Sequence, residues 1–267
     1  MAFQIQQQDS LLYVTSDLFS AQPDLTHAFS TRQGGVSKAP WDSLNLGVGR
    51  GDDLKDVEEN YRRFCSALQM PLERVVLTKQ VHEDTVRIVT EEDAGKGLFR
   101  PRDYTADAFL TDVPGLPLIA FGADCIVILL FDPVKRCIGA VHSGWRGTAQ
   151  GNLKKAVETM CSHYGSRPAD ILAAIGPGIG PCCFETDQDV PDAMLAALGD
   201  EALAYMQQRG SKWHVDLKAL NAHWLRLAGV EQIDLCPLCT ACRPDLFWSH
   251  RKMGPARGGQ VAAIALR

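Results

Sequence analysis

The sequence predicts an α/β fold in which mixed sheets are layered with helices. The middle of the chain carries short, continuous apolar runs, which are typical of strands that are covered on both faces. Segments with helical periodicity precede and follow these runs, and they begin at acidic capping residues or end at glycines. The composition, with 46% hydrophobic and 22% charged residues in a chain of 267, is that of a globular protein.

No repeat, low-complexity tract or linker divides the chain, so we expect one domain over residues 1–267. The net charge of -5 and the lack of basic clusters indicate neither nucleic acid nor an acidic membrane as a partner. No membrane-spanning run and no signal peptide are recognisable, which favours a cytoplasmic protein with small-molecule partners. Nine cysteines, an odd number, favour reduced thiols. Nothing in the sequence indicates the oligomeric state.

A polar, glycine-rich segment contains Gly34, Gly35 and residues 45–47, and its composition predicts a long functional loop. The first predicted helix comes after this loop. Asp52 and Asp53 can cap a helix after it, because an acidic residue near the positive helix end is favourable. The apolar stripe of this helix is Val57, Tyr61, Phe64 and Leu68. Strands are then expected over residues 74–77, 86–90, 106–110, 116–121, 126–131 and 136–141.

Helices and strands alternate in the last part of the chain. Periodicity predicts a helix over residues 148–163, which Gly165 ends, and then a buried strand over residues 171–175. Asp216 can cap a further helix that ends at Gly229. Two more strands are expected over residues 231–235 and 260–266.

Three residues of metal-ligand type lie at the ends of apolar runs: His82 in TKQVHED, Cys125 in FGADCIV and His142 in GAVHSGWRG. Two imidazoles and one thiolate are a known ligand set for catalytic zinc, in which a fourth position stays open for water or substrate. Strand ends and the loops after them are where a scaffold usually presents reactive groups. Each residue alone is more often a structural histidine or a packed cysteine than a ligand, and only folding can bring the three together.

The same residues allow a second chemistry, in which Cys125 is a nucleophile and His82 or His142 is the base that holds it as a thiolate. Metal content separates the two interpretations. Asp124, beside Cys125, is expected to orient a metal-bound histidine or to accept a proton from bound water.

Two arginines, Arg32 in FSTRQGGVS and Arg146 in SGWRG, lie among glycines, where a guanidinium can bind a phosphate or carboxylate in bidentate fashion. A solvated surface arginine is the alternative for each. The glycine-rich stretch over residues 176–180 does not match the dinucleotide-binding pattern, and its proline favours tight structural turns.

Cys236, Cys239 and Cys242 form a CxxCxxC run that could seed a zinc or iron–sulfur site, with Cys182 and Cys183 as completing ligands. No fourth ligand follows at the usual local spacing, so we expect mostly packed thiols there. The signatures of zinc proteases, zinc nucleobase deaminases, P-loop proteins and serine hydrolases are absent. None of the seven histidines forms an HxH pair, so zinc is favoured over a multinuclear copper site.

Several blocks together resemble the YfiH-like family, and they run in order from about Phe29 to the C-terminus. They are STRQGGVS, SLNLG, KQVH, TADAFLTD, ADC, AVHSGWRG, GPGIGPCCFE, SHR and GGQVAAIAL. This family appears under the names polyphenol oxidase (laccase), purine nucleoside phosphorylase and peptidoglycan editing factor. The resemblance implies a fold like that of cytotoxic necrotizing factor cysteine hydrolases, and zinc ligands at His82, Cys125 and His142. Ser143 and Glu83 depart from the residues usual in the family, which puts substrate preference in doubt but removes no ligand.

The resemblance implies a zinc-dependent purine nucleoside enzyme that phosphorolyses adenosine, inosine and methylthioadenosine and also deaminates adenosine. Its substrates would be a nucleoside and phosphate, with Arg32 or Arg146 as the phosphate ligand. Three alternatives stay open: an amidohydrolase that removes misincorporated serine from a cell-wall precursor, a copper polyphenol oxidase, and a non-catalytic binding module whose zinc is structural. The last would need a fourth protein ligand, for which Asp124 is the nearest candidate.

Overall fold

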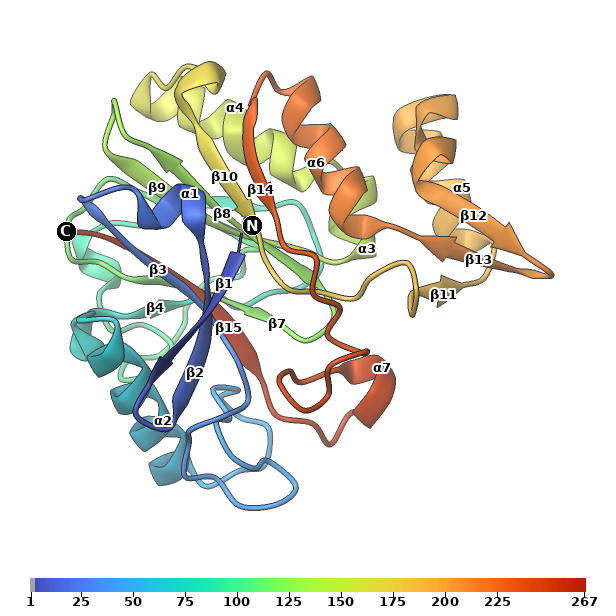
Figure 1. The fold of residues 1–267 in the computed structure, drawn as a ribbon. Coiled ribbons are helices and arrows are strands. Elements are labelled where there is room, and N and C mark those ends of the chain that lie inside the picture. The colour runs from blue at the N-terminus through green and yellow to red at the C-terminus, as the bar shows by residue number, and fades with distance from the viewer. Residues whose placement is uncertain (1–2) are drawn as a thin grey trace.

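The protein is built from four layers, which the computed structural model describes over residues 3–267 (Figure 1). Helices α4 (Asn152–Tyr164) and α6 (Leu217–Leu227) form the first layer, and two six-stranded sheets, sheet B and sheet A, form the second and third. Helix α2 (Leu54–Ala67) covers the far face of sheet A and is the fourth layer. A four-layer α/β arrangement with mixed sheets confirms the predicted fold class.

Sheet A contains strands from both ends of the described chain. Its spatial order is β1 (Phe3–Gln8), β2 (Leu11–Ser16), β3 (Leu25–Ser30), β15 (Gln260–Leu266), β7 (Leu118–Gly122) and β4 (Val76–Leu77). Only the pair of β4 and β7 is parallel. Strand β15 is buried on both faces, because Ala262 and Ile264 point toward sheet B while Val261 and Ala263 point toward α2.

Sheet B carries the continuous apolar runs of the central sequence. Its spatial order is β14 (Gln232–Leu235), β10 (Leu172–Ile175), β8 (Ile126–Asp132), β9 (Cys137–Ser143), β6 (Ala108–Thr111) and β5 (Val86–Ile88). Along β8, Ile126, Ile128 and Leu130 pack against the helices, whereas alternate residues pack against sheet A. The runs lack apolar–polar alternation because neither face of this strand meets water.

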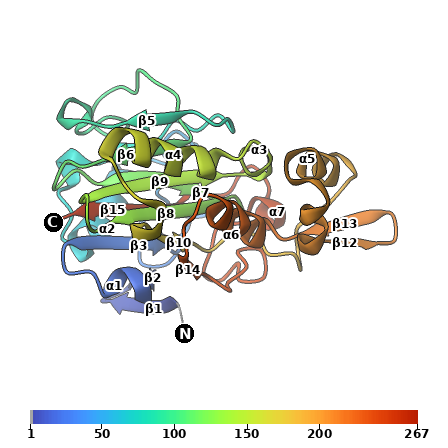
Figure 2. The same ribbon diagram turned by 90° about the horizontal axis from the view of Figure 1, so that it is seen from above.

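A smaller unit projects from one side of the layers (Figure 2). It consists of α5 (Asp189–Leu198) and sheet C, whose spatial order is β11 (Glu185–Thr186), β13 (Lys212–Val215) and β12 (Met206–Arg209). Three short helices complete the structure: α1 (Asp17–Ser20), α3 (Trp145–Ala149) and α7 (His250–Met253). Within residues 3–267, no helix combines the length and the apolar character that crossing a membrane requires.

The elements predicted from residue 52 onward are confirmed with small shifts of their ends, with one exception. The helix expected over residues 148–163 begins only at Asn152, as α4, because Gly151 before it adopts a left-handed backbone with φ of 67°; residues 148 and 149 instead end the short helix α3. The loop expected around Gly34 to Gly47 extends over residues 31–53, which contain no helix or strand. The strands of residues 3–30, helix α5 and sheet C had no counterpart in the prediction.

Candidate functional site

The structure brings His82, Cys125 and His142 together at one end of the two sheets. His82 lies in the loop between β4 and β5, Cys125 in the turn between β7 and β8, and His142 near the end of β9. One donor atom from each residue lies within 4.8 Å of the other two. The imidazole rings meet edge to face, with centroids 4.9 Å apart. We refer to these residues as the trio.

The buried carboxylate of Asp107 holds both histidines of the trio. Its Oδ1 lies 2.7 Å from Nδ1 of His142, so the Nε2 atom of that ring is left for a ligand. The same carboxylate accepts backbone N–H bonds from Val81, His82 and Glu83 at 3.0–3.1 Å. These bonds fix the loop at His82, whose backbone is left-handed with φ of 63°. A non-glycine residue in this conformation is costly and is characteristic of functional sites.

Burial and nearby charges shift the pKa values of the two histidines of the trio in opposite directions. Burial alone would lower the pKa of His142, but its interactions with Cys125 and the Asp107 carboxylate outweigh burial and raise this pKa to about 9. Burial and the neighbouring His142 lower the pKa of His82. Burial would raise the pKa of Asp107, but the hydrogen bonds from His142 and the backbone keep it below its usual value. The site therefore pairs a carboxylate with His142 and keeps His82 neutral.

The carboxylate of Asp124 is bound by three donors, none of which belongs to the trio. Its Oδ1 accepts a hydrogen bond of 2.6 Å from the Thr240 hydroxyl, and its Oδ2 accepts bonds from the Ser249 hydroxyl and the Arg251 backbone N–H. These bonds tie the left-handed turn before Cys125, where φ of Asp124 is 85°, to the C-terminal segment. Asp107, which the sequence analysis did not single out, takes the place beside histidine that we had expected for Asp124.

Two cavities meet at the trio and differ in character. The first has a volume of about 270 Å³, and its basic lining residues are Arg50, Lys79, Arg102 and Arg257. The second has a volume of about 320 Å³ and is walled by Trp145, Ile179, Phe184 and Leu217. His82, Ala123, Cys125 and Arg257 line both. The trio thus lies between a cationic and a largely apolar compartment.

Arg257 is the basic residue that both compartments share. Burial and the nearby Arg50 lower the pKa of its guanidinium to about 10. One of its terminal nitrogens donates to the Gly258 carbonyl, while its buried Nε has no hydrogen-bond partner among residues 3–267. A buried donor without a partner is costly in a folded protein, so this atom points to a ligand.

The two arginines expected from the sequence lie outside these cavities. Arg32 donates to the backbone carbonyls of Asp42 and Pro244, and its guanidinium stacks 4.0 Å from the centre of the Trp248 ring. Arg146 is exposed and stacks over Trp145 at 4.2 Å. Arg32 therefore braces two loops, and Arg146 acts on the site through its charge, which lowers the pKa of His82. Neither residue lines the cavity that contains the other cationic groups.

The donor atoms of the trio are of the right type and are placed closely enough to bind one metal ion. Asp107 holds the His142 ring through Nδ1, so that Nε2 is the nitrogen available to the trio, which is the usual support of a metal-bound histidine. Gly144 leaves room for the ligand atoms, since a Cβ there would lie 2.9 Å from His82 Nδ1 and 3.2 Å from Cys125 Sγ. No fourth histidine, cysteine or carboxylate joins this group in the part of the chain that the structure describes. Three protein ligands with an open position are typical of catalytic metal sites.

Comparison with known proteins places the chain in a family. The family model described as multi-copper polyphenol oxidoreductase laccase matches residues 26–267. The chain belongs to this family, the YfiH-like family that the sequence blocks indicated. The family name refers to copper, but the trio offers only two histidines and one cysteine.

Several relatives in this family are named purine nucleoside phosphorylases. The protein named purine nucleoside phosphorylase YlmD of Geobacillus stearothermophilus is 38% identical, and the match covers 89% of each chain. The protein named purine nucleoside phosphorylase YfiH of Escherichia coli is 37% identical over 84% of this chain and 86% of its own length. The crystal structure of the hypothetical protein YfiH of Bacillus licheniformis superimposes with a TM-score of 0.92 at 32% identity, covering 98% and 99% of the two chains. These names support an enzyme.

Proposed function

We propose that this protein is a zinc-dependent purine nucleoside phosphorylase that acts on adenosine, inosine and methylthioadenosine and also deaminates adenosine. The observation that carries the proposal is the position of the trio between a cationic and an apolar cavity. Phosphorolysis needs one subsite for an anion and another for a flat, largely apolar base, and both must open on the reacting carbon. The names of the relatives agree with this reaction.

The cationic cavity suits inorganic phosphate. Arg257 offers its unpaired Nε, and Arg50, Lys79 and Arg102 add positive charge to the same wall. Guanidinium groups bind phosphate oxygens through charge-assisted hydrogen bonds, which a buried position strengthens. Arg257 therefore replaces Arg32 and Arg146 as our choice for the phosphate ligand.

The apolar cavity suits the purine. The rings of Trp145 and Phe184 and the side chains of Ile179 and Leu217 form its walls, which allow stacking on the base and exclude water. Arg251 and His250 lie at the same cavity and supply polar groups for the base edge or the ribose. A nucleoside placed here directs its glycosidic bond toward the trio.

The metal is proposed to be zinc, held by His82, Cys125 and His142. A zinc ion bound there supplies a Lewis acid that stabilises negative charge on an oxygen. Asp107 keeps His142 oriented, while Arg257 holds and positions the attacking phosphate. The described residues gather no larger set of histidines around a possible ion, which favours zinc over the several coppers of an oxidase.

One assay set tests the proposal. The purified protein is analysed for metal and then incubated with adenosine, with and without phosphate, and the products are separated by chromatography. We expect about one trio-bound zinc, adenine and ribose 1-phosphate only when phosphate is present, and inosine from deamination. Cys125→Ala should remain folded and lose both activities.

Other outcomes of the same set contradict the proposal. Zinc-loaded protein that leaves adenosine unchanged in phosphate would exclude the phosphorylase. Bound copper together with oxidation of a polyphenol would favour the oxidase, and serine release from a muramyl precursor would favour the editing amidohydrolase. The relation to necrotizing factor hydrolases and a nucleophilic Cys125 stay predictions, which trapping of a covalent intermediate on Cys125 would support.

Arg257→Ala tests the phosphate subsite directly. We expect the KM for phosphate to rise about 10- to 100-fold, because a hydrogen bond to a charged group contributes about 1.5–3 kcal/mol. The KM for the nucleoside should change less. Arg62→Ala is the matched control, since Arg62 is exposed on α2 and pairs with Glu59. Equal KM values for phosphate in the Arg257 variant and the wild type would remove Arg257 from the subsite.

A further inference from the structure

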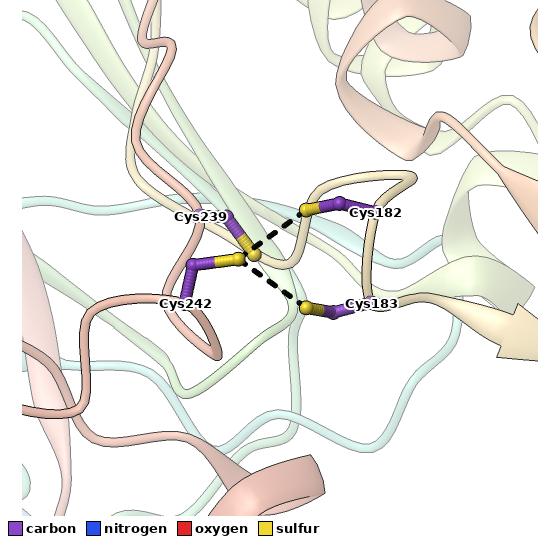
Figure 3. Close-up of side chains that lie close together, drawn as sticks. All are labelled: Cys182, Cys183, Cys239 and Cys242. Carbon is purple, nitrogen blue, oxygen red and sulfur yellow. Dashed lines mark hydrogen bonds between the residues drawn. The ribbon is translucent and has the colours of Figure 1, made fainter.

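A second group of metal-ligand residues lies outside the trio (Figure 3). Cys182 and Cys183 come from the loop between β10 and β11, and Cys239 and Cys242 come from the loop after β14. The four sulfur atoms lie within 4.8 Å of one another. We call these residues the cysteine cluster. In Figure 3 the four side chains converge on one point from two separate loops.

The spacing of the sulfurs fits a single tetrahedral ion. Zinc–sulfur bonds of about 2.3 Å place the four sulfurs of a tetrahedral site about 3.8 Å apart. Cys242 Sγ lies 3.5 Å from Cys182 Sγ and 3.4 Å from Cys183 Sγ, and every other pair is within 4.8 Å. These distances are too long for disulfide bonds. An iron–sulfur cube needs room for eight atoms between its ligands, which this spacing does not provide.

The surrounding backbone is arranged for negatively charged sulfur. The backbone N–H of Gly180 donates to Cys239 Sγ at 3.2 Å, a contact that a thiolate strengthens. A Cβ at Gly180 would lie 3.3 Å from Cys182 Sγ, so the glycine lets the loop pass close to both sulfurs. Nearby, the Thr240 N–H donates to the Gly178 carbonyl at 3.2 Å and joins the two loops.

The composition of the cluster corrects the expectation from the sequence. Cys236 does not join it, because this residue is fully buried in the core between the two sheets. Only Cys239 and Cys242 of the CxxCxxC run join the cluster, and the other two ligands come from the vicinal pair Cys182 and Cys183, about sixty residues earlier in the chain. We had expected packed thiols, but two of the four cysteines, Cys182 and Cys242, are exposed. Cys239 is buried in the core beside the helices and Cys183 packs against that core, but core packing does not explain why the exposed Cys182 and Cys242 converge on them.

We propose that Cys182, Cys183, Cys239 and Cys242 bind one structural zinc ion that fastens the loop after β10 to the loop after β14. With four thiolates the site is closed, unlike the trio, which leaves a position open. The four thiols release their protons to solvent when the ion binds. The proposal does not depend on the reaction performed at the trio.

The fastened loops contact the active site. Thr240, between Cys239 and Cys242, donates to Asp124, which holds the turn before Cys125. Ile179 and Phe184, on either side of the vicinal cysteines, form part of the apolar cavity. The second ion is therefore expected to hold the cavity wall and the Cys125 turn in place without touching substrate.

X-ray absorption at the zinc edge of the Cys125→Ala protein tests the proposal. This variant loses a trio ligand, so the remaining zinc should show four sulfur neighbours at about 2.3 Å and no nitrogen. We expect about two zinc ions per chain in the wild type, one in Cys125→Ala and one in the double variant Cys239→Ser/Cys242→Ser. Cys236→Ala and Cys161→Ser are matched controls outside the cluster and should retain two.

Three results would overturn the proposal. They are a Cys125→Ala protein that retains no zinc, a remaining zinc with nitrogen or oxygen neighbours, and a disulfide between cluster cysteines in the non-reduced protein by mass spectrometry. If the double serine variant does not fold, the spectrum of the Cys125→Ala protein still decides. Loss of activity in a folded double variant that retains the trio zinc would further show that the cluster positions the site.

Discussion

At the scale of single residues, Asp107 connects parts of the site that are distant in sequence. Its carboxylate binds His142 through the ring nitrogen and His82 through the backbone. Both histidines therefore depend on one buried anion, which carries no ligand atom of its own. Residues that orient metal ligands in this way usually matter nearly as much for metal affinity and activity as the ligands themselves.

Asp107→Asn should weaken metal binding by the trio about 10- to 100-fold, which is the usual cost of losing such a partner. The asparagine keeps the shape of the side chain but removes the negative charge that favours the ligating tautomer of His142. Competition with a chromophoric chelator measures the affinity. Asp112→Asn, an exposed substitution just after β6, is the matched control and should leave the affinity unchanged.

Gly144→Ala tests the space that the trio needs. The φ of −67° at Gly144 is allowed for alanine, so the apoprotein should unfold at the same or slightly higher denaturant concentration. The added Cβ would press on His82 and Cys125 at 2.9 and 3.2 Å and should lower zinc affinity at least tenfold. Unchanged affinity would show that the two side chains move aside without cost.

The candidate metal ligands could be predicted from the sequence, but the residues that orient them or line the cavity beside them could not. His82, Cys125 and His142 are residue types that bind metals and lie beside apolar runs. Asp107 lies in the TADAFLTD block and shows no local signal, because its four donors come from segments that only folding brings near. Arg257 was missed for the same reason, since its cavity is formed by loops far apart in the chain.

At the scale of elements, capping residues marked helix starts reliably. Asp53 caps α2, and Asp216 caps α6 by accepting the Ala219 backbone N–H at 3.0 Å. A cap is a local interaction, so it can be recognised without knowledge of the fold. Helix α6 contributes Leu217 to the apolar cavity, so its start also affects the site.

Asp216→Ala should destabilise the protein by about 1 kcal/mol, the typical cost of removing an N-cap side chain. Asp216→Asn should retain most of this stability because its amide oxygen can accept the same bond. Urea unfolding of the metal-free proteins measures both. Equal losses in the two variants would indicate that the charge of Asp216, rather than its capping bond, stabilises the helix.

The elements that the sequence did not reveal are those set by tertiary contacts. Strand β1 has only one buried and one half-buried residue, and its FQIQQQ sequence alternates apolar and polar residues over only its first four positions. Helices α3 and α4 are separated by only two residues, Gln150 and Gly151, so the sequence did not reveal the break between them. The break places the Asn152 side chain where it donates to the His142 carbonyl at 2.8 Å. The break between α3 and α4 therefore lies where Asn152 holds the backbone of His142.

At the scale of the whole molecule, His27 links stability to pH. It is buried in sheet A and accepts the Ser16 backbone N–H through Nε2 at 2.8 Å. Burial lowers its pKa from 6.5 to about 4, so between these values the unfolded chain binds more protons. The contribution of neutral His27 is complete above pH 6.5 and is lost as the pH falls toward 4.

His27→Gln should reduce the acid sensitivity of the protein. Between pH 7 and pH 5 the wild type should lose about 2 kcal/mol more unfolding free energy than this variant, because glutamine does not titrate. The amide oxygen can still accept the Ser16 N–H. Urea unfolding at the two pH values gives the comparison, and parallel losses in the two proteins would show that other groups cause the acid sensitivity.

The position of β15 within sheet A determines when this sheet can finish folding. This strand pairs with β3 on one side and β7 on the other, yet it follows every other strand of its sheet in the chain. During synthesis β3 must therefore wait, with an unpaired edge, for a partner about 230 residues later. Such late, long-range pairing slows folding and leaves an aggregation-prone edge exposed to the cell. A nascent chain that stalls before residue 260 would carry the trio but could not close the sheet beneath it.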